Sequence, residues 1–383
     1  MNNKRMLMIA DADSFWTQRL LENLLLPAGY EVVLFPIWGD GGKYDAFYRE
    51  NGVTVYHDRN TLPVIRHIPR LRMWARVALN ARGLKKLGPF DIVHNHYLSQ
   101  RDLALGARLA RFFHAHWVAS FWGSDLMRSS PRALAQMAPY LKKANKITVH
   151  SELNRAMIRR VYGQDAAEKT VLLYFGQNGY QDIDKARQAY TRAQCRESFG
   201  ILPGRFVVCV GYSASSAQQQ KDVIEAMSRL PKERLERITL VLQQTYGEND
   251  PAYTAATREL AGRLPCQTVV LTRFMGPEES AMLRLSADVF VLAIKTDAFS
   301  ASMQEYLYAG ACVIKGAWLG YPQLEEMDVS LPSFERFDEI PTLLESAMDG
   351  RITGLPPEKR AQLPQRYSWQ AVKDSWLSLY PRG

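Results

Sequence analysis

The chain has 383 residues, of which 47% are hydrophobic and 23% are charged. This length predicts two domains of roughly 150 to 200 residues, and the composition excludes extensive disorder. No window reaches the roughly 18 to 20 uncharged apolar residues of a transmembrane helix, and the apolar run 6–10 is too short for a signal peptide. We expect a cytoplasmic globular protein.

Charge is divided unevenly along the chain. Residues 1–160 carry 24 Lys and Arg against 12 Asp and Glu, a net charge of +12, whereas residues 161–383 carry 24 against 27, a net charge of −3. The stretch 64–86 mixes Arg and Lys with apolar residues, a combination suited to an anionic membrane surface. A solvated helix face over a core is the alternative for this stretch. Nucleic acid is not expected as a partner, because no aromatic and basic binding signature accompanies the charge.

The four cysteines lie far apart in the second half of the chain, at Cys195, Cys209, Cys266 and Cys312. This spacing fits neither a zinc site nor a redox pair. We expect free thiols, mostly buried.

Strand-like and helix-like segments alternate along the whole chain. In the first half, strands are expected over 7–10, 31–35, 91–94, 117–121, 147–150 and 171–174, and helices over 15–26, 71–82 and 103–113. The polar stretch 176–204 is the candidate domain boundary. The second half then predicts strands over 206–210, 238–242, 268–271, 289–292 and 312–315, and helices over 219–228, 252–262, 277–286 and 300–309. The alternation predicts an α/β protein with two doubly wound, Rossmann-like parallel sheets that face each other across a cleft.

Segment 289–314 is the most specific part of the sequence. A buried strand precedes Asp297, a helix begins at Ser300-Ala301-Ser302, Glu305 follows one turn later, and Gly310 ends the helix. Unpaired N–H groups at such a helix start can bind a diphosphate. The Glu305 carboxylate can accept hydrogen bonds from two hydroxyls, as in a ribose, and Asp297 would lie near a sugar ring. The alternative is that both acids are ordinary exposed positions.

This layout resembles the donor-binding motif of family 4 glycosyltransferases, which have the two-domain GT-B fold. In that family two acids with the separation of Asp297 and Glu305 flank the start of this helix, and Phe299 and Gly310 also agree with the motif. Asp297 replaces the usual Glu, and Ser300 replaces the usual Gly, so the sugar is left open. The resemblance implies an acceptor-binding domain over 1–178 and a nucleotide-sugar-binding domain over 179–367. The last helix, about 368–383, is expected to return to the first domain.

Further donor-binding residues are implied by the same resemblance. Gly211 and Ser213 follow the strand 206–210, and Lys221 is the candidate for a phosphate-binding cation, while Tyr212 replaces the family's Arg. After the strand 268–271 the resemblance places the nucleotide base, which two residues could cover, Arg273 and Phe274; a core position for the Phe is the alternative. The Ser- and Gln-rich form of this half is also loosely similar to the 4-acetamidofucose transferase of enterobacterial common antigen.

The N-terminal half resembles the family more weakly, through segments 91–96 and 120–126. Trp122 stands where the family often has a histidine near the sugar, so His94 is a candidate for that polar role, with a purely structural histidine as the alternative. The other acceptor-side candidates are His96, Gly123 and Asp125. Asp13 is a candidate general base, although it or Ser14 could instead cap the first helix.

The leading prediction is a glycosyltransferase that moves a sugar from a nucleotide diphosphate sugar to a hydroxyl of a glycan or a lipid-linked acceptor. We place it in bacterial surface polysaccharide or glycolipid synthesis, in the cytoplasm or at the inner face of the cell membrane. The resemblance implies retention of the anomeric configuration. No metal or other cofactor is expected, since helix amides and Lys221 can neutralise the departing diphosphate. A nucleotide-sugar 2-epimerase and a degenerate, non-catalytic binding protein are the alternatives.

Overall fold

The structure is a computed structural model that describes residues 4–38, 42–58, 69–297 and 299–381, without the side chains of 69–74. The chain forms two compact units. Unit 1 comprises residues 1–176 and 369–383, and unit 2 comprises residues 177–368. The chain therefore passes from unit 1 to unit 2 two residues before the expected boundary at 178 and 179.

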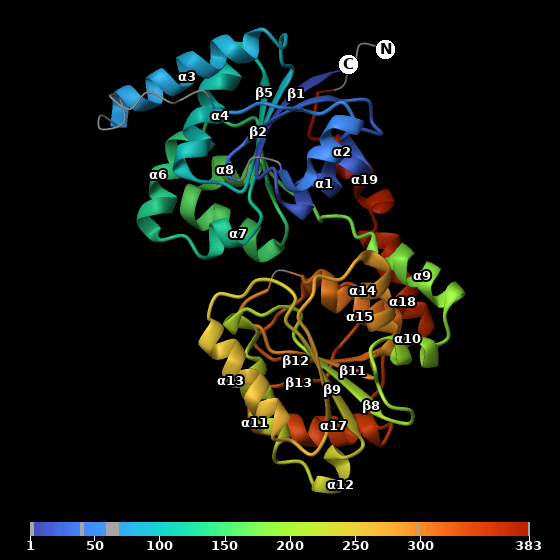
Figure 1. Cartoon of the computed structure of the whole chain (residues 1–383). Helices are drawn as coiled ribbons and strands as arrows, with labels where there is room; N and C mark the ends of the chain where they lie inside the picture. The colour runs from blue at the N-terminus through green and yellow to red at the C-terminus, as the bar shows by residue number, and fades with distance from the viewer. Residues whose placement is uncertain (1–3, 39–41, 59–68, 298, 382–383) are drawn as a thin grey trace. The chain divides into compact units, whose positions relative to one another are not determined.

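Unit 1 is built on a seven-stranded sheet whose strand pairs are all parallel (Figure 1). Its strand order is β3 (Thr54–Val55), β2 (Glu31–Pro36), β1 (Arg5–Ala10), β4 (Ile92–His96), β5 (His116–Ser120), β6 (Lys146–Val149) and β7 (Thr170–Leu172). The central strands β1 and β4 are almost wholly buried. This burial explains the nearly continuous apolar sequence of β1, because both faces of a parallel sheet are covered by helices. In β4 the same burial encloses the polar residues His94, Asn95 and His96.

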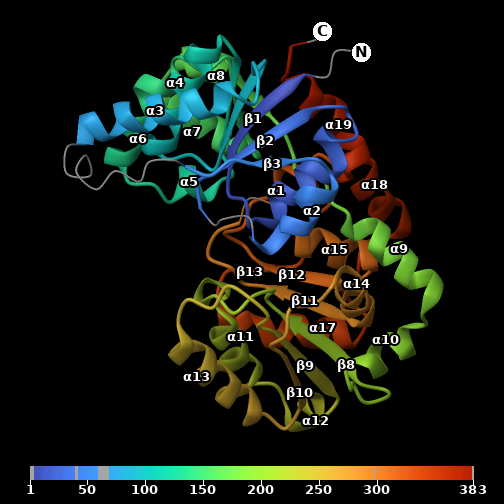
Figure 2. The same cartoon turned by 45° about the horizontal axis from the view of Figure 1, so that its top comes forward.

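Helices cover both faces of this sheet. One face carries α1 (Phe15–Leu20), which continues as a π-helical turn over Leu21–Leu25, together with α2 (Asp45–Glu50) and α19 (Trp369–Leu377), as Figure 2 shows. The other face carries α3 (Pro69–Lys85), α4 (Gln100–Phe113), α6 (Pro131–Leu141), α7 (Glu152–Tyr162) and α8 (Gln164–Glu168). The short α5 (Ser124–Met127) follows β5. Trp376 of α19 is fully buried and its Nε1 donates to the Tyr174 carbonyl at 2.8 Å. The C-terminal helix therefore belongs to unit 1, as expected.

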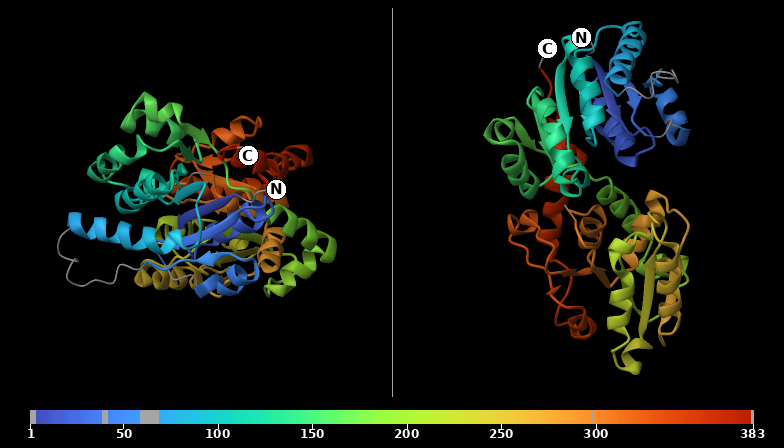
Figure 3. Two further views of the ribbon diagram at one scale, coloured as in Figure 1. Left: turned by 90° about the horizontal axis from the view of Figure 1, so that it is seen from above. Right: turned by 90° about the vertical axis from the view of Figure 1, so that its left-hand side faces the viewer.

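The basic stretch 64–86 is described only in part, since residues 64–68 lie outside the described residues. Its helix α3 lies on the outside of unit 1 (Figure 3). Arg82, Lys85 and Lys86 are exposed. Arg76 is buried, forms an ion pair with Asp58 and is not available to a membrane. The expectation of a charged surface over 64–86 therefore does not hold at Arg76, because its guanidinium group is buried and pairs with Asp58 inside the unit.

Unit 2 contains a six-stranded sheet, again with parallel strand pairs. Its order is β10 (Gln267–Leu271), β9 (Ile238–Gln243), β8 (Phe206–Val210), β11 (Val289–Leu292), β12 (Cys312–Gly316) and β13 (Ser333–Phe334). One face carries α11 (Gln220–Met227), α13 (Pro251–Gly262) and α17 (Ile340–Met348). The other carries α9 (Gly179–Ala189), α10 (Arg192–Ser198), α14 (Pro277–Ser286), α15 (Ala301–Ala309) and α18 (Pro357–Tyr367). The short helices α12 (Lys232–Leu235) and α16 (Pro322–Glu325) precede β9 and β13.

Two doubly wound parallel sheets are thus present, and the predicted α/β class is confirmed. The chain changes unit at the start of the polar stretch 176–204, and the rest of this stretch forms α9 and α10, which pack against α14. Their many charged residues conceal a narrow buried stripe, formed by Tyr180, Ile183 and Ala186 on α9. The four cysteines are free thiols, and all except Cys266 are buried.

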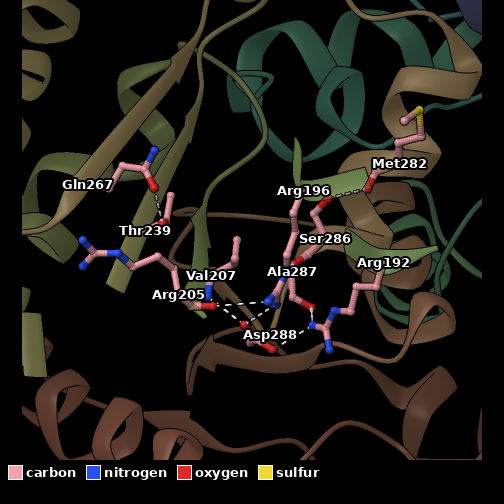
Figure 4. Close-up of polar contacts among 10 residues, drawn as sticks. All are labelled: Arg192, Arg196, Arg205, Val207, Thr239, Gln267, Met282, Ser286, Ala287 and Asp288. Atoms are coloured by element: carbon pink, nitrogen blue, oxygen red, sulfur yellow. Dashed lines mark hydrogen bonds and ion pairs between the residues drawn. The ribbon is translucent and has the colours of Figure 1, made fainter. Parts of the chain in front are cut away.

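An ion-pair network at the amino ends of β8 and β11 fastens α10 to the sheet (Figure 4). Asp288 pairs with Arg192 at 2.7 Å and with Arg196 at 2.6 Å, and it accepts the backbone N–H of Val207 at 2.7 Å. Arg196 also donates to the Ser286 carbonyl at 3.0 Å. We name Arg192, Arg196 and Asp288 the Asp288 clamp. Most of the further hydrogen-bond partners of this clamp are backbone groups, so the clamp fixes the course of the backbone.

No helix in the described part of the chain is both long and apolar enough to cross a membrane.

Candidate functional site

The carboxyl ends of β8 and β11 form a topological switch point in unit 2. These two strands are neighbours, and the helices that follow them, α11 and α15, lie on opposite faces of the sheet. Their loops are joined, because Lys295 N–H donates to the Ala217 carbonyl at 3.0 Å and Gln219 Nε2 donates to the Ala293 carbonyl at 2.5 Å. Doubly wound sheets bind ligands at such a point, so this is the first place to look for a site.

The start of α15 is shaped by Asp297. Its Oδ2 accepts the Ser300 N–H and the Tyr321 hydroxyl, both at 2.8 Å. The Ser300 hydroxyl caps the helix by accepting the Met303 N–H at 3.3 Å. The Ser300 amide is therefore used within the protein, whereas the amides of Ala301 and Ser302 have no protein acceptor among the described residues. Two open amides at a helix start are suited to an anionic oxygen.

The loop after β8 lies beside the start of α15 and contributes small or uncharged side chains to the site. Gly211 adopts the left-handed conformation, with φ of +63°, and Ser213 is buried beside Gly247. Tyr212, which stands at the position of the family's Arg, donates its backbone N–H to Gln218 Oε1 at 3.3 Å, and its hydroxyl lies near the side chains of Gln218 and Ser300. Burial and the nearby Asp297 raise the pKa of Tyr212. Tyr212 thus links the two loops and brings no charge to the site.

Three other predicted donor-side residues are more exposed. Lys221 lies in the first turn of α11, with its Nζ 3.5 Å from Glu225 Oε1. Arg273 is exposed and pairs with Glu279. Phe274 is 63% exposed, so the alternative of a core position for it is wrong. An exposed Phe274 is compatible with the predicted role of covering a nucleotide base.

Glu305 lies one turn inside α15 and is only 18% exposed. Its Oε2 accepts a hydrogen bond from Nε of Arg284 at 3.1 Å. On the other side, a Cβ atom added to Gly179 would lie 2.4 Å from Glu305 Oε1, so only glycine fits there without a shift of the acid. The exposed alternative for Glu305 is wrong, because α9 and α14 cover this face of α15.

Arg284 was not predicted, although it is the most highly connected charge of the site. It is 4% exposed, and besides Glu305 it donates to Gln243 Oε1 at 3.1 Å, Ser302 Oγ at 3.2 Å and the Tyr306 hydroxyl at 3.3 Å. The guanidinium also lies over the Tyr306 ring, 4.5 Å from its centre. The one sequence signal is a charge between the apolar residues Leu283 and Leu285, a pattern that surface helices also show.

Burial raises the pKa of the Glu305 carboxyl group, and the charge and hydrogen bond of Arg284 oppose this shift without cancelling it. For Arg284, burial acts to lower the pKa, but the neighbouring Tyr306 and Glu305 outweigh it and the pKa is raised. Arg284 therefore stays positively charged, and its charge favours the ionised form of the neighbouring Glu305 carboxyl group.

In unit 1 the predicted residues gather at the carboxyl ends of β4 and β5. His94 is fully buried, with Nε2 2.7 Å from Ser120 Oγ and Nδ1 3.0 Å from the Tyr380 hydroxyl. Burial lowers its pKa to about 3. Both ring nitrogens are satisfied inside the unit, which favours the structural alternative for His94 over a role in proton transfer.

His96 and His150 are two buried histidines that each have one ring nitrogen hydrogen-bonded. The Trp122 indole Nε1 donates to His96 Nδ1 at 3.1 Å, so neutral His96 carries its proton on Nε2. His150 Nδ1 donates to the Leu173 carbonyl, which leaves its Nε2 as an acceptor. Both Nε2 atoms are buried and without a partner in the described part of the chain. Burial lowers the pKa of His96 well below its usual range and that of His150 to about 4.

The remaining acceptor-side residues organise loops. Asp125 is buried and accepts the N–H groups of Leu98, Trp122 and Gly123 at 2.7, 2.9 and 2.9 Å. Burial raises the pKa of Asp125 to about 6, against the effect of these bonds. Asp13, after β1, accepts the Lys43 N–H at 3.0 Å, and Ser14 caps α1. The cap is thus Ser14, and Asp13 fastens a neighbouring loop.

Comparison with known proteins agrees with this architecture. Residues 18–176 match the sequence model of Glycosyltransferase Family 4. The similarity to that family is confirmed, and it is recognised in unit 1, where fewer motif residues carried it. Comparison with curated proteins found no match.

Solved structures of glycosyltransferases share the fold over nearly the whole chain. HepE of Anabaena, in complex with UDP and glucose, is 16% identical, with a TM-score of 0.72 over 98% of this chain and 99% of HepE. A glycosyltransferase of Rickettsia africae is 16% identical, with a TM-score of 0.78 over 99% and 98% of the two chains. Sucrose-phosphate synthase of Thermosynechococcus elongatus is 16% identical, with a TM-score of 0.70 over 98% of each chain. The chain therefore has the GT-B fold of these enzymes.

Proposed function

We propose that the chain is a glycosyltransferase that binds a nucleotide diphosphate sugar at the switch point of unit 2 and transfers the sugar to an acceptor hydroxyl. The observation that carries the proposal is the pairing, on one helix, of two open amides at Ala301 and Ser302 with the carboxylate of Glu305. The amides suit a diphosphate, and the carboxylate suits the two hydroxyls of a ribose. Structural neighbours with UDP and UDP-glucose bound support the same class of donor.

In this proposal the protein groups stabilise the leaving diphosphate. The Ala301 and Ser302 amides are fixed before the reaction and donate to oxygens on which negative charge develops. Lys221, whose present partner is the weakly held Glu225, is placed to add a cation. Asp297 is held by Tyr321 and Ser300, and the family resemblance assigns its carboxylate to the side of the sugar, where it would accept a sugar hydroxyl. Two further parts of the proposal are retention of configuration, which follows from the family resemblance, and independence of metals, which follows from the helix amides and Lys221.

A thermal-shift series with UDP, GDP, ADP, CDP and dTDP tests the binding step. A ligand at 100 times its dissociation constant stabilises the protein by about 2.7 kcal/mol, which a melting curve resolves. The nucleotide that binds is then used as its sugar conjugates, with chelator present, and transfer to a glycan or lipid-linked acceptor is measured. Absence of a shift with all five would contradict the proposal. A change of the sugar without acceptor would indicate the epimerase alternative, and abolition by chelator would contradict metal independence.

A contact of unit 1 with an anionic membrane is a further part of the proposal. It rests on the net charge of residues 1–160 and on the exposed Arg82, Lys85 and Lys86 of α3 and its end. Co-sedimentation with anionic but not neutral vesicles is expected, and it should weaken when these three residues are replaced by Gln and when salt is added. Equal binding to both kinds of vesicle would contradict it.

A further inference from the structure

Among the residues that the structure describes, Arg284 has four hydrogen-bond partners, and all four are side chains. Glu305, Ser302 and Tyr306 come from α15, and Gln243 is the last residue of β9. A guanidinium group is planar and offers five donors in a fixed fork, so contacts in several directions place it uniquely. Because Arg284 is itself held in one position, it fixes the positions of the side chains to which it is hydrogen-bonded.

The Glu305 carboxylate is confined from two sides. Arg284 holds Oε2, and the absent side chain of Gly179 leaves just enough room for Oε1. A carboxylate this deeply buried would lose its charge without a cationic partner. A neutral carboxyl group would have to donate one of its hydrogen bonds, and it would accept from hydroxyls more weakly than a carboxylate does.

Arg284 also connects two parts of the proposed site. Its Nη2 donates to Ser302 Oγ, and Ser302 carries one of the two open amides at the start of α15. The same guanidinium thus fixes the residue that would meet a phosphate and the residue that would meet a ribose. Lysine, with a single point of charge, cannot span Glu305, Ser302 and Gln243 together.

We propose that Arg284 is a positioning residue that fixes the Glu305 carboxylate as the acceptor of the ribose hydroxyls, so that the site prefers ribonucleotides to 2′-deoxyribonucleotides. This inference rests on the proposed function. Arg284 does not touch the nucleotide; it acts through Glu305 and Ser302. Gly179 acts on Glu305 from the opposite side, and it is the second residue on which the preference depends.

Titration calorimetry with UDP, GDP and ADP, each beside its 2′-deoxy form, tests the proposal. The wild-type protein should prefer the ribose form roughly tenfold, the value of one charge-assisted hydrogen bond. Arg284→Met should reduce this preference to less than about twofold, and Arg284→Lys should keep only part of it. Gly179→Ala should also reduce it, because the new Cβ displaces the acid while Arg284 stays in place.

Arg196→Lys is the matched control, since it alters a partly buried arginine of the same unit in the Asp288 clamp. It should lower the melting temperature and leave the ribose preference unchanged. A folded Arg284→Met protein that keeps the wild-type preference would overturn the inference. If that variant does not fold, an unchanged preference in Gly179→Ala overturns it equally. If the wild-type protein binds none of the three ribonucleotides, the proposed function fails and takes this inference with it.

Discussion

Unit 2 contains two networks of arginine and carboxylate at opposite ends of its strands. The Asp288 clamp lies at the amino ends of β8 and β11, where Arg196 donates to the Ser286 and Arg205 carbonyls and Asp288 accepts the Val207 N–H. The Arg284 network lies toward the carboxyl ends and reaches Glu305 and its neighbours only through side chains.

The difference in partners separates two uses of the same chemistry. An arginine bonded to backbone groups fixes the path of the chain, so its loss is felt as a loss of folding stability. An arginine hydrogen-bonded to side chains fixes the geometry of those side chains, so its loss changes their affinity for a ligand. Ion pairs that look alike in a sequence can therefore be told apart by the atoms that they join.

The largest effect is expected from breaking the clamp. Asp288→Ala leaves Arg196 without its charge partner in a mostly buried position, which should cost about 3 kcal/mol of folding free energy. For a unit of this size, that is a fall in melting temperature of roughly 6 to 12 °C. Calorimetry should show this fall while nucleotide affinity at a temperature well below the transition stays within twofold. A large loss of affinity in the folded variant would remove the distinction between the networks.

The second prediction concerns the other network. Glu305→Gln keeps an oxygen for Arg284 but loses the charge, and nucleotide binding should weaken roughly ten- to hundredfold, from about 1.5 to 3 kcal/mol of charge-assisted hydrogen bonding. Titration calorimetry gives the affinity, and a melting curve verifies the fold. Wild-type affinity in a folded variant would show that Glu305 has no part in binding.

The third prediction is a pH dependence. The pKa of Glu305 is raised by burial, so protonation begins above the usual carboxyl range, and the ionised form accepts hydroxyl hydrogen bonds more strongly than the neutral form. Affinity should therefore fall as the pH is lowered through this raised pKa, by up to about tenfold per pH unit. The same titration with Glu305→Gln corrects for protonation of the ligand. Parallel curves for the two proteins would contradict the assignment.

The smallest effect is expected at Lys221. Its side chain is 44% exposed, and its ion pair with Glu225 is long. Lys221→Gln should weaken nucleotide binding by roughly two- to fivefold, the size of an exposed charge contact, and the difference should shrink as salt is added. An effect as large as that of Glu305→Gln would place the main phosphate charge at Lys221 and would weaken the case for the helix amides.

The sequence predicted both sheets because buried parallel strands have a strong apolar signal and alternate with helices. It predicted segment 297–305 because strand end, helix start and acid follow one another in the chain. Arg284 could not be found in this way, since its partners Gln243 and Ser302 are distant in sequence and meet only in the fold. The helices α9 and α10 were missed because their buried stripes are short and their exposed faces are highly charged.

The histidine cluster of unit 1 has a consequence for acid resistance. All seven histidines of the chain lie before residue 151, and the buried ones have depressed pKa values, about 3 for His94 and about 4 for His150. A histidine that is neutral in the folded state takes up a proton on unfolding once the pH falls below its ordinary pKa. Each such histidine therefore lowers the free energy of unfolding as the pH decreases. With His96 included, three histidines destabilise unit 1 as the pH falls below their ordinary pKa, and Asp125, whose pKa is raised to about 6, offsets only part of this loss. Unit 2 has no histidine, so mild acid should melt unit 1 first and leave the proposed nucleotide site folded.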